Sequence, residues 1–291
     1  MPTPHGRRSY RSIRSILETP IMDDHKWGKL PNIDADMIFL DLEDSVAPGS
    51  KAAARERVVQ ALRDRIFDGE KLLLPRVNHI ESEWGRDDIA ALAAVRPDVV
   101  AYPKIRSAAC VDTVVNEFRR HGADPDIFAI IETAQSVLEV REIAAHPSVI
   151  GLMSGPADIS LDAGIELYEP NGELNSIFET TKALTVLAGA AYGLAVTDIA
   201  YARDIRDFDE IRRRIESSRR KGFTTMTTFY PPHVDIINEV FSPREAEVAA
   251  ATALVDTYEK ALADGKAAVL SDAGTPILIH EYEKARLVLG R

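Results

Sequence analysis

Carboxylate side chains follow short apolar runs in this 291-residue chain. In the stretch IFLDLEDSVAPGSKAAAR, a run that ends at Leu40 leads directly into Asp41, Glu43 and Asp44. A later run, FAII, ends in the same way at Glu132. An apolar run with acidic residues at its tip is typical of a buried strand that carries catalytic or metal-binding groups at its carboxyl end. We therefore interpret these residues as candidates for chemistry.

Glu132 and Asp158 are the candidate metal ligands. Glu132 follows FAII, and Asp158 follows the next apolar run, VIGLMSG. Carboxylates from two adjacent strands could converge on one divalent cation, and oxygen ligands with retained waters suit Mg²⁺, with Mn²⁺ as the alternative. Either residue could instead cap a following helix. The seven histidines are scattered without the spacing of metal ligands, which argues against zinc.

Basic residues follow two other runs. Arg76 comes after KLLLP, and its guanidinium could hold a substrate carboxylate, pair with Glu43 or Asp44, or do both. Lys104 comes after AYP and is a second candidate for substrate binding. It could be a Schiff-base nucleophile, but we favour an ion pair at the strand end. Arg14 precedes the first run in a segment crowded with basic residues, so the residues alone assign it no role.

These side chains need a scaffold that gathers strand ends together. Eight apolar runs alternate with stretches of helical periodicity. The runs are RSILET, MIFLDL, KLLLPRV, DVVAYPKI, IFAIIET, VIGLMSG, YGLAVTDI and FTTMTTF. Most are continuously apolar, which is typical of strands buried on both faces of a parallel sheet. The pattern predicts a (β/α)8 TIM barrel with its chemistry at the carboxyl ends of the strands. A doubly wound sheet is the alternative, but no G-x-G-x-x-G follows the first run.

The chain is expected to divide into a barrel over residues 1–240 and a C-terminal helical extension over residues 241–291. One helix should run from after Pro243 to about residue 263, and the tail TPILIHEYEKARLVLGR should form another amphipathic helix. Such an extension could pack on a neighbouring subunit or on its own barrel. The loop at 163–175, with its Gly, Pro and Asn residues, is a candidate lid.

Composition excludes several classes of protein. The net charge of −11 argues against a nucleic-acid binder. The single cysteine excludes disulfide frameworks and zinc clusters. No apolar run approaches the roughly 20 residues that span a bilayer, and the basic first segment lacks the apolar core of a secretory signal. We therefore predict a cytoplasmic enzyme with no nucleic-acid or membrane partner.

Several motifs in this order carry a family resemblance: RSILETP, DLEDSVAPGSKAAAR, PRVN, YPKI, IIETAQSVL and SGPADIS. They resemble the citrate lyase beta-subunit-like family, within the 2-keto-acid aldolase and citrate lyase superfamily, over roughly residues 10–240. The resemblance implies a (β/α)8 barrel that binds Mg²⁺ and assembles as a trimer or hexamer. It also implies a reaction between a keto acid and an acyl-CoA enolate, although some members are thioesterases or malate synthases.

Site residues carry over from the family by position. The resemblance implies that Glu132 and Asp158 bind the metal and that Arg76 holds the substrate carboxylate. Glu43 and Asp44 would then support Arg76 and the metal-bound waters.

The resemblance also assigns Arg14 to the acyl or phosphate end of the substrate, but two other stretches depart from the family pattern. FYPPHV stands where I-H-P-x-Q is typical, and GTPILIHE stands where many lyases have G-x-M-I-D, so that Leu278 takes the place of an aspartate. Tyr230 and His233 thus become candidates for proton transfer, with surface loop residues as the alternative.

Together these features predict an Mg²⁺-dependent carbon–carbon lyase that joins or separates a keto acid and an acyl-CoA enolate. One alternative is an aldolase that acts on pyruvate- or oxaloacetate-type acids without CoA. Another is a carrier-dependent or non-catalytic subunit that binds a metal-chelated keto acid. In each case the expected partners are a small keto acid, with or without a CoA thioester, and further copies of the chain.

Overall fold

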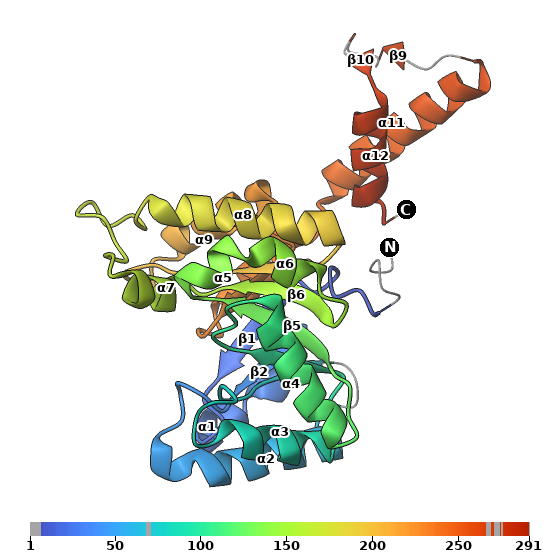
Figure 1. Ribbon diagram of the computed structural model, residues 1–291. Coiled ribbons are helices and arrows are strands. Elements are labelled where there is room, and N and C mark those ends of the chain that lie inside the picture. The colour runs from blue at the N-terminus through green and yellow to red at the C-terminus, as the bar shows by residue number, and fades with distance from the viewer. Residues whose placement is uncertain (1–6, 68–70, 266–268, 271–273, 275, 291) are drawn as a thin grey trace. The chain divides into compact units, whose positions relative to one another are not determined.

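The computed structural model describes residues 7–67, 71–265, 269–270, 274 and 276–290. The chain divides into two compact units, one over Met1–Phe241 and one over Ser242–Arg291. Figure 1 traces both units from the blue N-terminal segment to the red C-terminal helices.

The first unit is a closed barrel of eight parallel strands, which confirms the predicted TIM barrel (Figure 1). Each strand pairs with the next along the chain, and the first pairs with the last. The strands are β1 (Ser15–Thr19), β2 (Met37–Asp41), β3 (Leu72–Arg76), β4 (Val99–Tyr102), β5 (Asp126–Ile131), β6 (Val149–Ser154), β7 (Ala195–Ile199) and β8 (Thr225–Thr228). Every one of the eight apolar runs therefore supplies a strand.

Helices follow the strands and surround the barrel (Figure 1). They are α1 (Asp24–Trp27), α2 (Lys51–Asp64), α3 (Gly85–Ala93), α4 (Ala108–Arg120), α5 (Ala134–Leu138), α6 (Val140–Ala145), α7 (Pro156–Ala163), α8 (Ile177–Tyr192), α9 (Phe208–Lys221) and α10 (His233–Phe241). Two short 3₁₀ turns, η1 (Leu30–Asn32) and η2 (Pro48–Ser50), lie between strands and helices.

Local sequence sets the bounds of α9. The Asp207 side chain accepts a hydrogen bond from the backbone N–H of Glu210 and so caps the first turn. The helix ends at Gly222, whose φ of 103° lies in the left-handed region that glycine adopts without a steric penalty.

The continuous apolar runs become barrel strands because both of their faces are buried. Ile16, Phe39 and Phe128 belong to a cluster that fills the barrel interior, whereas Leu17 belongs to the cluster between the strands and the helices. Gly151 of β6 leaves room for the Phe128 ring in the barrel interior, because a Cβ at position 151 would lie 2.3 Å from that ring. The interior is thus packed, and chemistry is confined to the barrel ends.

The second unit has its own small core. It contains α11 (Glu245–Ala263), β9 (Val269–Leu270), β10 (Pro276–Ile277) and α12 (Ile279–Val288). The rings of Tyr258 and Tyr282 stack with centroids 4.7 Å apart, and Val255, Ile277 and Ala285 complete the cluster. Both helices expected in this region are present, whereas the two short strands were not predicted.

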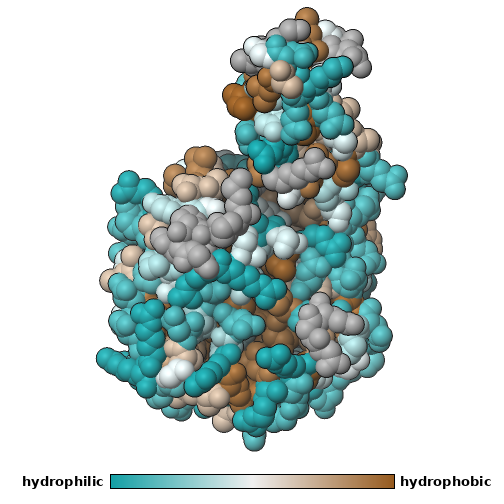
Figure 2. Space-filling view, turned by 90° about the vertical axis from the view of Figure 1, so that its right-hand side faces the viewer, coloured by the Kyte–Doolittle hydropathy of each residue, from teal (hydrophilic) through white to brown (hydrophobic). Residues whose placement is uncertain are grey.

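The face shown in Figure 2 is mainly hydrophilic, with smaller groups of hydrophobic residues between the polar ones. Within the described part of the chain, no helix combines the length and the apolar character that a bilayer crossing requires.

Candidate active site

Four charged side chains form the uppermost inward-facing layer of the barrel. Side chains alternate between the interior and the exterior along each strand. Counting upward from interior residues places Glu18 (β1), Asp41 (β2), Arg76 (β3) and Glu132, just after β5, above the apolar filling. The interior residues below them are Ile16, Phe39, Leu74 and Ile130. We call this carboxyl end of the barrel the mouth.

Arg76 is held at the mouth by three carboxylates. Its Nε donates to Asp41 Oδ1 at 2.7 Å, and its two terminal nitrogens lie 3.3 Å from Glu43 Oε2 and 3.5 Å from Asp44 Oδ2. Burial opposes the charge of Arg76, but the hydrogen bond and the charge of Asp41 outweigh it and raise the pKa of the guanidinium. The ion pairs predicted with Glu43 and Asp44 are present, while the shortest contact, to Asp41, was not predicted.

Lys51 fixes the loop that carries these carboxylates. Its Nζ donates to Leu42 O at 2.7 Å, to Glu43 O at 2.6 Å and to Asn78 Oδ1 at 2.8 Å. Asn78 Nδ2 also donates to Leu42 O, at 2.8 Å. An ammonium group has three protons, so Lys51 is fully used in positioning the loop. Sequence reasoning missed this lysine, although it lies inside the DLEDSVAPGSK motif.

Lys104 links the acidic loop to Glu132. Its backbone N–H donates to Glu132 Oε1 at 2.6 Å, and its Nζ donates to Glu43 Oε1 at 2.8 Å. Its φ of 52° lies in the left-handed region, which costs a non-glycine residue about 1–2 kcal/mol. Such local strain is common at functional sites. Burial disfavours the charge, but the bond to Glu43 raises the pKa of the amine. The structure therefore matches the predicted ion pair and gives no support for a neutral Schiff-base nucleophile.

Glu132 and Asp158 have the electrostatics expected of carboxylates that would hold a cation. Glu132 is 2% exposed, and burial together with the charges of Glu43 and Asp158 raises its pKa to about 8. Burial, followed by the charge of Asp44, also raises the pKa of Asp158 in the first turn of α7. A cation placed between them would relieve this repulsion.

Gly155 lets the turn before α7 approach Glu132. A Cβ at this position would lie 2.5 Å from Glu132 Cβ and 3.1 Å from Oε2. Among the described residues, no group of three or more His, Cys, Asp or Glu side chains forms a metal site by itself. Glu132 and Asp158 would supply two carboxylates to an ion that completes its coordination with water or substrate oxygens, as Mg²⁺ does.

The proton-transfer role predicted for His233 is not supported. His233 is 1% exposed, its Nδ1 lies 3.0 Å from Thr228 Oγ1, and its Nε2 lies 2.8 Å from Ile205 O. A carbonyl oxygen only accepts, so Nε2 is the donor, and burial lowers the pKa of the ring towards the neutral form. His233 therefore anchors the turn after β8. Tyr230 packs edge-on against it, with ring centroids 5.0 Å apart.

Arg14 lies at the opposite end of the barrel from the mouth. It precedes β1, and its Nε and Nη2 donate to Asp36 at 3.0 and 2.7 Å. Asp36 directly precedes β2, so this pair joins the amino ends of two strands. The substrate-binding role predicted for Arg14 is corrected accordingly, because residues at the amino ends of barrel strands serve stability.

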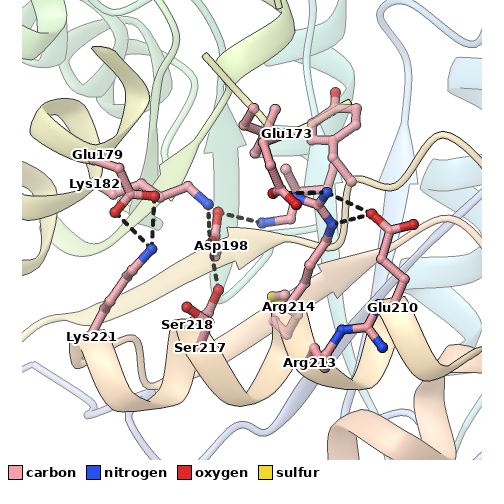
Figure 3. A pocket seen from close by; sticks show the side chains of 14 residues that line it. Glu173, Glu179, Lys182, Asp198, Glu210, Arg213, Arg214, Ser217, Ser218 and Lys221 are labelled. Atoms are coloured by element: carbon pink, nitrogen blue, oxygen red, sulfur yellow. Dashed lines mark hydrogen bonds and ion pairs between the residues drawn. The ribbon is translucent and has the colours of Figure 1, made fainter. Parts of the chain in front are cut away.

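Asp198 also follows an apolar run but points away from the mouth. Thr197 faces the interior, where its Oγ1 lies 2.9 Å from Thr227 Oγ1, so the next residue faces outward. Asp198 accepts hydrogen bonds from Lys182 Nζ at 2.7 Å and Ser218 Oγ at 2.6 Å. These groups line a charged pocket of about 270 Å³ beside α8 and α9 (Figure 3).

Two further mouth residues, Glu18 and Tyr201, were missed by sequence reasoning. Burial and the charges of Asp41, Asp44 and Glu43 raise the pKa of Glu18, although Arg76 counteracts them. Tyr201 follows β7, and its pKa is raised to about 12 by burial, with Asp158 and Glu18 as further causes. Glu18 could have been recognised from the sequence, because it stands at the end of an apolar run as Glu132 does.

A second pocket adjoins the mouth. It has a volume of about 470 Å³ and shares Glu43, Asp44 and Lys104 with the mouth. Its outer wall includes Trp84 and Arg106. An aromatic ring and a guanidinium are suited to a larger, anionic part of a substrate that does not itself react.

The amino-acid sequence of the chain is similar to that of a known enzyme family. A family model described as HpcH/HpaI aldolase/citrate lyase matches residues 15–231. A (3S)-malyl-CoA thioesterase of Cereibacter sphaeroides is 34% identical over 260 residues, which cover 89% of this chain and 88% of that protein. An L-malyl-CoA/beta-methylmalyl-CoA lyase of the same species is 30% identical over 259 residues, covering 81% of each.

A solved structure agrees with these relatives. The citrate lyase beta subunit of Mycobacterium tuberculosis, complexed with oxaloacetate and magnesium, has a TM-score of 0.69 and 26% identity, over 80% of this chain and 99% of that one. These similarities confirm the resemblance that the sequence motifs indicated and the predicted enzyme class, a carbon–carbon lyase. The chain belongs to the HpcH/HpaI aldolase/citrate lyase family.

Proposed function

We propose that this enzyme is an Mg²⁺-dependent lyase that cleaves a β-hydroxyacyl-CoA into a keto acid and an acyl-CoA, or forms it in reverse. The observation that carries the proposal is the arrangement at the mouth. A buried arginine hydrogen-bonded to Asp41 lies in the same layer as Glu132, and the charge of Asp158, in the first turn of α7, helps to raise the pKa of Glu132. The two relatives named for malyl-CoA support a CoA thioester as part of the substrate.

Glu132 and Asp158 would hold the Mg²⁺ ion, as magnesium in the related citrate lyase subunit suggests. When bound, the ion would act as a Lewis acid on the oxygens of the keto or hydroxy acid. Mn²⁺ has similar oxygen preferences and is the alternative ion.

Arg76 would bind the substrate carboxylate. Its Nε is committed to Asp41, but the contact to Asp44 Oδ2 is long, at 3.5 Å, and the Asp44 side chain is 56% exposed. An incoming carboxylate could displace Asp44 and take a bidentate bond from the guanidinium. Lys104 supports the same site through its bond to Glu43.

The pocket beside the mouth would receive the pantetheine arm of a thioester. It adjoins Lys104 and Glu43, and it presents Trp84 and Arg106 to a long substrate. A CoA-independent aldolase would have no use for this pocket, which favours the thioester over a free hydroxy acid. Assembly with further copies of the chain remains part of the proposal, tested by sedimentation.

Hydrolysis of the thioester is the second candidate function, because the 34% identical relative is a (3S)-malyl-CoA thioesterase. The same mouth could serve it by activating water instead of breaking a carbon–carbon bond.

One NMR time course separates these functions. The protein would be mixed with malyl-CoA, citramalyl-CoA and free 4-hydroxy-2-keto acids, first with Mg²⁺ and then with EDTA. EDTA-sensitive release of a keto acid with an acyl-CoA supports the lyase, whereas free CoA with a hydroxy acid supports the thioesterase. Turnover of the free acids alone would favour the aldolase, and no turnover of any substrate would contradict the proposal. Glu132→Ala should abolish Mg²⁺-dependent turnover, and Glu56→Ala, on exposed α2 surface, should not.

A further inference from the structure

The mouth contains one carboxylate that neither the metal site nor the arginine uses. Glu18 follows Ile16 of the barrel interior and Leu17 of the outer layer, so the alternation of β1 turns Glu18 into the mouth. It is half-buried and lies in the field of Arg76.

The other acidic groups already have a partner or a proposed role: Asp44 pairs with Arg76, and Asp158 belongs to the proposed metal site. Asp41 accepts from Arg76 and from the backbone N–H groups of Glu43 and Ser45. Glu43 binds Lys104, and Glu132 accepts from the backbone of Lys104. Among the described residues, none forms a hydrogen bond or an ion pair with the Glu18 side chain. Glu18 is therefore the mouth carboxylate available to exchange a proton with a substrate.

Other side chains that could transfer a proton are replaced or occupied. Leu278 stands where the G-x-M-I-D pattern of many lyases has its aspartate, and a leucine side chain cannot carry a proton. Both ring nitrogens of His233 are already hydrogen-bonded within the protein. A lyase of this type still needs a group that takes and returns one proton.

We propose that Glu18 is the catalytic residue that transfers the proton in carbon–carbon bond cleavage and formation. The inference rests on the proposed lyase function. The charged and titratable groups that face Glu18 are Arg76 from β3, Asp41, Glu43 and Asp44 from the end of β2, and Tyr201 from the loop after β7.

The step balances with one carboxylate. In cleavage, Glu18 accepts the proton of the substrate hydroxyl group, and the bond between the hydroxyl-bearing carbon and the carbon next to the thioester breaks. The electron pair moves onto the thioester carbonyl and leaves an enolate, while the hydroxyl-bearing carbon becomes the carbonyl of the keto acid. Protonated Glu18 then gives the same proton to the enolate carbon. The products are a keto acid and an acyl-CoA, and Glu18 is again ionised.

The test uses Glu18→Gln, which keeps the shape and removes the base. Deuterium exchange into the α-carbon of acetyl-CoA, followed by NMR in D₂O with Mg²⁺ and oxalate as an unreactive keto-acid mimic, measures the enolisation step alone. We expect this exchange and the cleavage rate to fall about 10²- to 10⁴-fold. Binding of Mg²⁺ and oxalate by calorimetry should change by less than about threefold, because neither depends on proton transfer.

Two further variants make the result decisive. Glu18→Asp retains a carboxylate and should recover part of the exchange, whereas Glu56→Gln, an exposed glutamate on α2, should match the wild type. A Glu18→Gln protein that exchanges at the wild-type rate, or that loses exchange only in proportion to lost oxalate binding, overturns the inference. A wild-type protein without lyase turnover would instead contradict the proposed function, so the two failures are distinguishable.

Discussion

Replacing Gly155 by alanine should damage the metal site through a single methyl group. The new Cβ would lie 2.5 Å from Glu132 Cβ, about 1 Å short of ordinary carbon–carbon contact. The φ of Gly155 is −121°, outside the left-handed region, so the cost comes from the contact and not from the backbone conformation. Either the turn before α7 or the Glu132 side chain must move.

The expected losses of stability and turnover in Gly155→Ala follow from this close contact. Overpacking in a filled region costs about 1–3 kcal/mol, which for a domain of this size corresponds to a decrease in melting temperature of roughly 2–10 °C. A displacement of about 1 Å at a catalytic group can reduce the rate on the order of 10²-fold. We therefore expect Gly155→Ala to fold, to bind Mg²⁺ more weakly and to lose most of its turnover.

Gly49→Ala is the matched control. Gly49 lies in η2, and a Cβ there would meet no atom within 4 Å. Calorimetry with Mg²⁺ and thermal unfolding would be measured on both variants and the wild type. If Gly155→Ala behaves like Gly49→Ala in melting temperature and Mg²⁺ affinity, the close packing of Gly155 against Glu132 does not define the metal site.

Three further predictions concern particular side chains. Burial raises the pKa of Glu132 to about 8, above its unfolded value, so the metal-free folded protein binds a proton more tightly than the unfolded chain. The stability of the metal-free protein should therefore decrease as the pH rises from about 5 to 8. The affinity for Mg²⁺ should increase over the same pH range, and calorimetry at several pH values would detect both changes. Lys51→Met removes the hydrogen bonds that the ammonium group donates to Leu42 O, Glu43 O and Asn78 Oδ1, and should lower the free energy of unfolding by at least about 2 kcal/mol in chemical denaturation; an unchanged midpoint would contradict this. His233→Gln should lower the melting temperature without changing the pH dependence of turnover, since His233 anchors the turn after β8.

The positions of most strands, and several mouth residues, could be predicted because each depends on a local pattern. A run of buried residues that ends in a charge marks a strand tip, and this was enough to find Arg76 and Glu132. Asp198 satisfied the same pattern yet faces outward, because a shift of one residue along a strand moves a side chain to the other face. The sequence shows that Asp198 lies near a strand end but not which face it occupies.

Residues whose roles depend on distant partners could not be predicted in this way. His233 is fixed by the carbonyl of Ile205, which lies 28 positions earlier in the chain. Lys51 acts through carbonyls and an amide that only the folded loop brings together. Arg14 was misassigned for a different reason, since it precedes its strand and therefore belongs to the amino end of the barrel.

The charge at the mouth would favour a bound cation. Carboxylates outnumber cationic side chains there. The acidic residues are Glu18, Asp41, Glu43, Asp44, Glu132 and Asp158, and the basic ones are Lys51, Arg76 and Lys104. All three basic side chains donate their shortest side-chain hydrogen bonds to the acidic loop, so little positive charge faces outward to attract an anionic keto acid. A divalent ion between Glu132 and Asp158 would reverse this balance locally and offer the anion a binding site. We therefore expect the metal to bind before the keto acid.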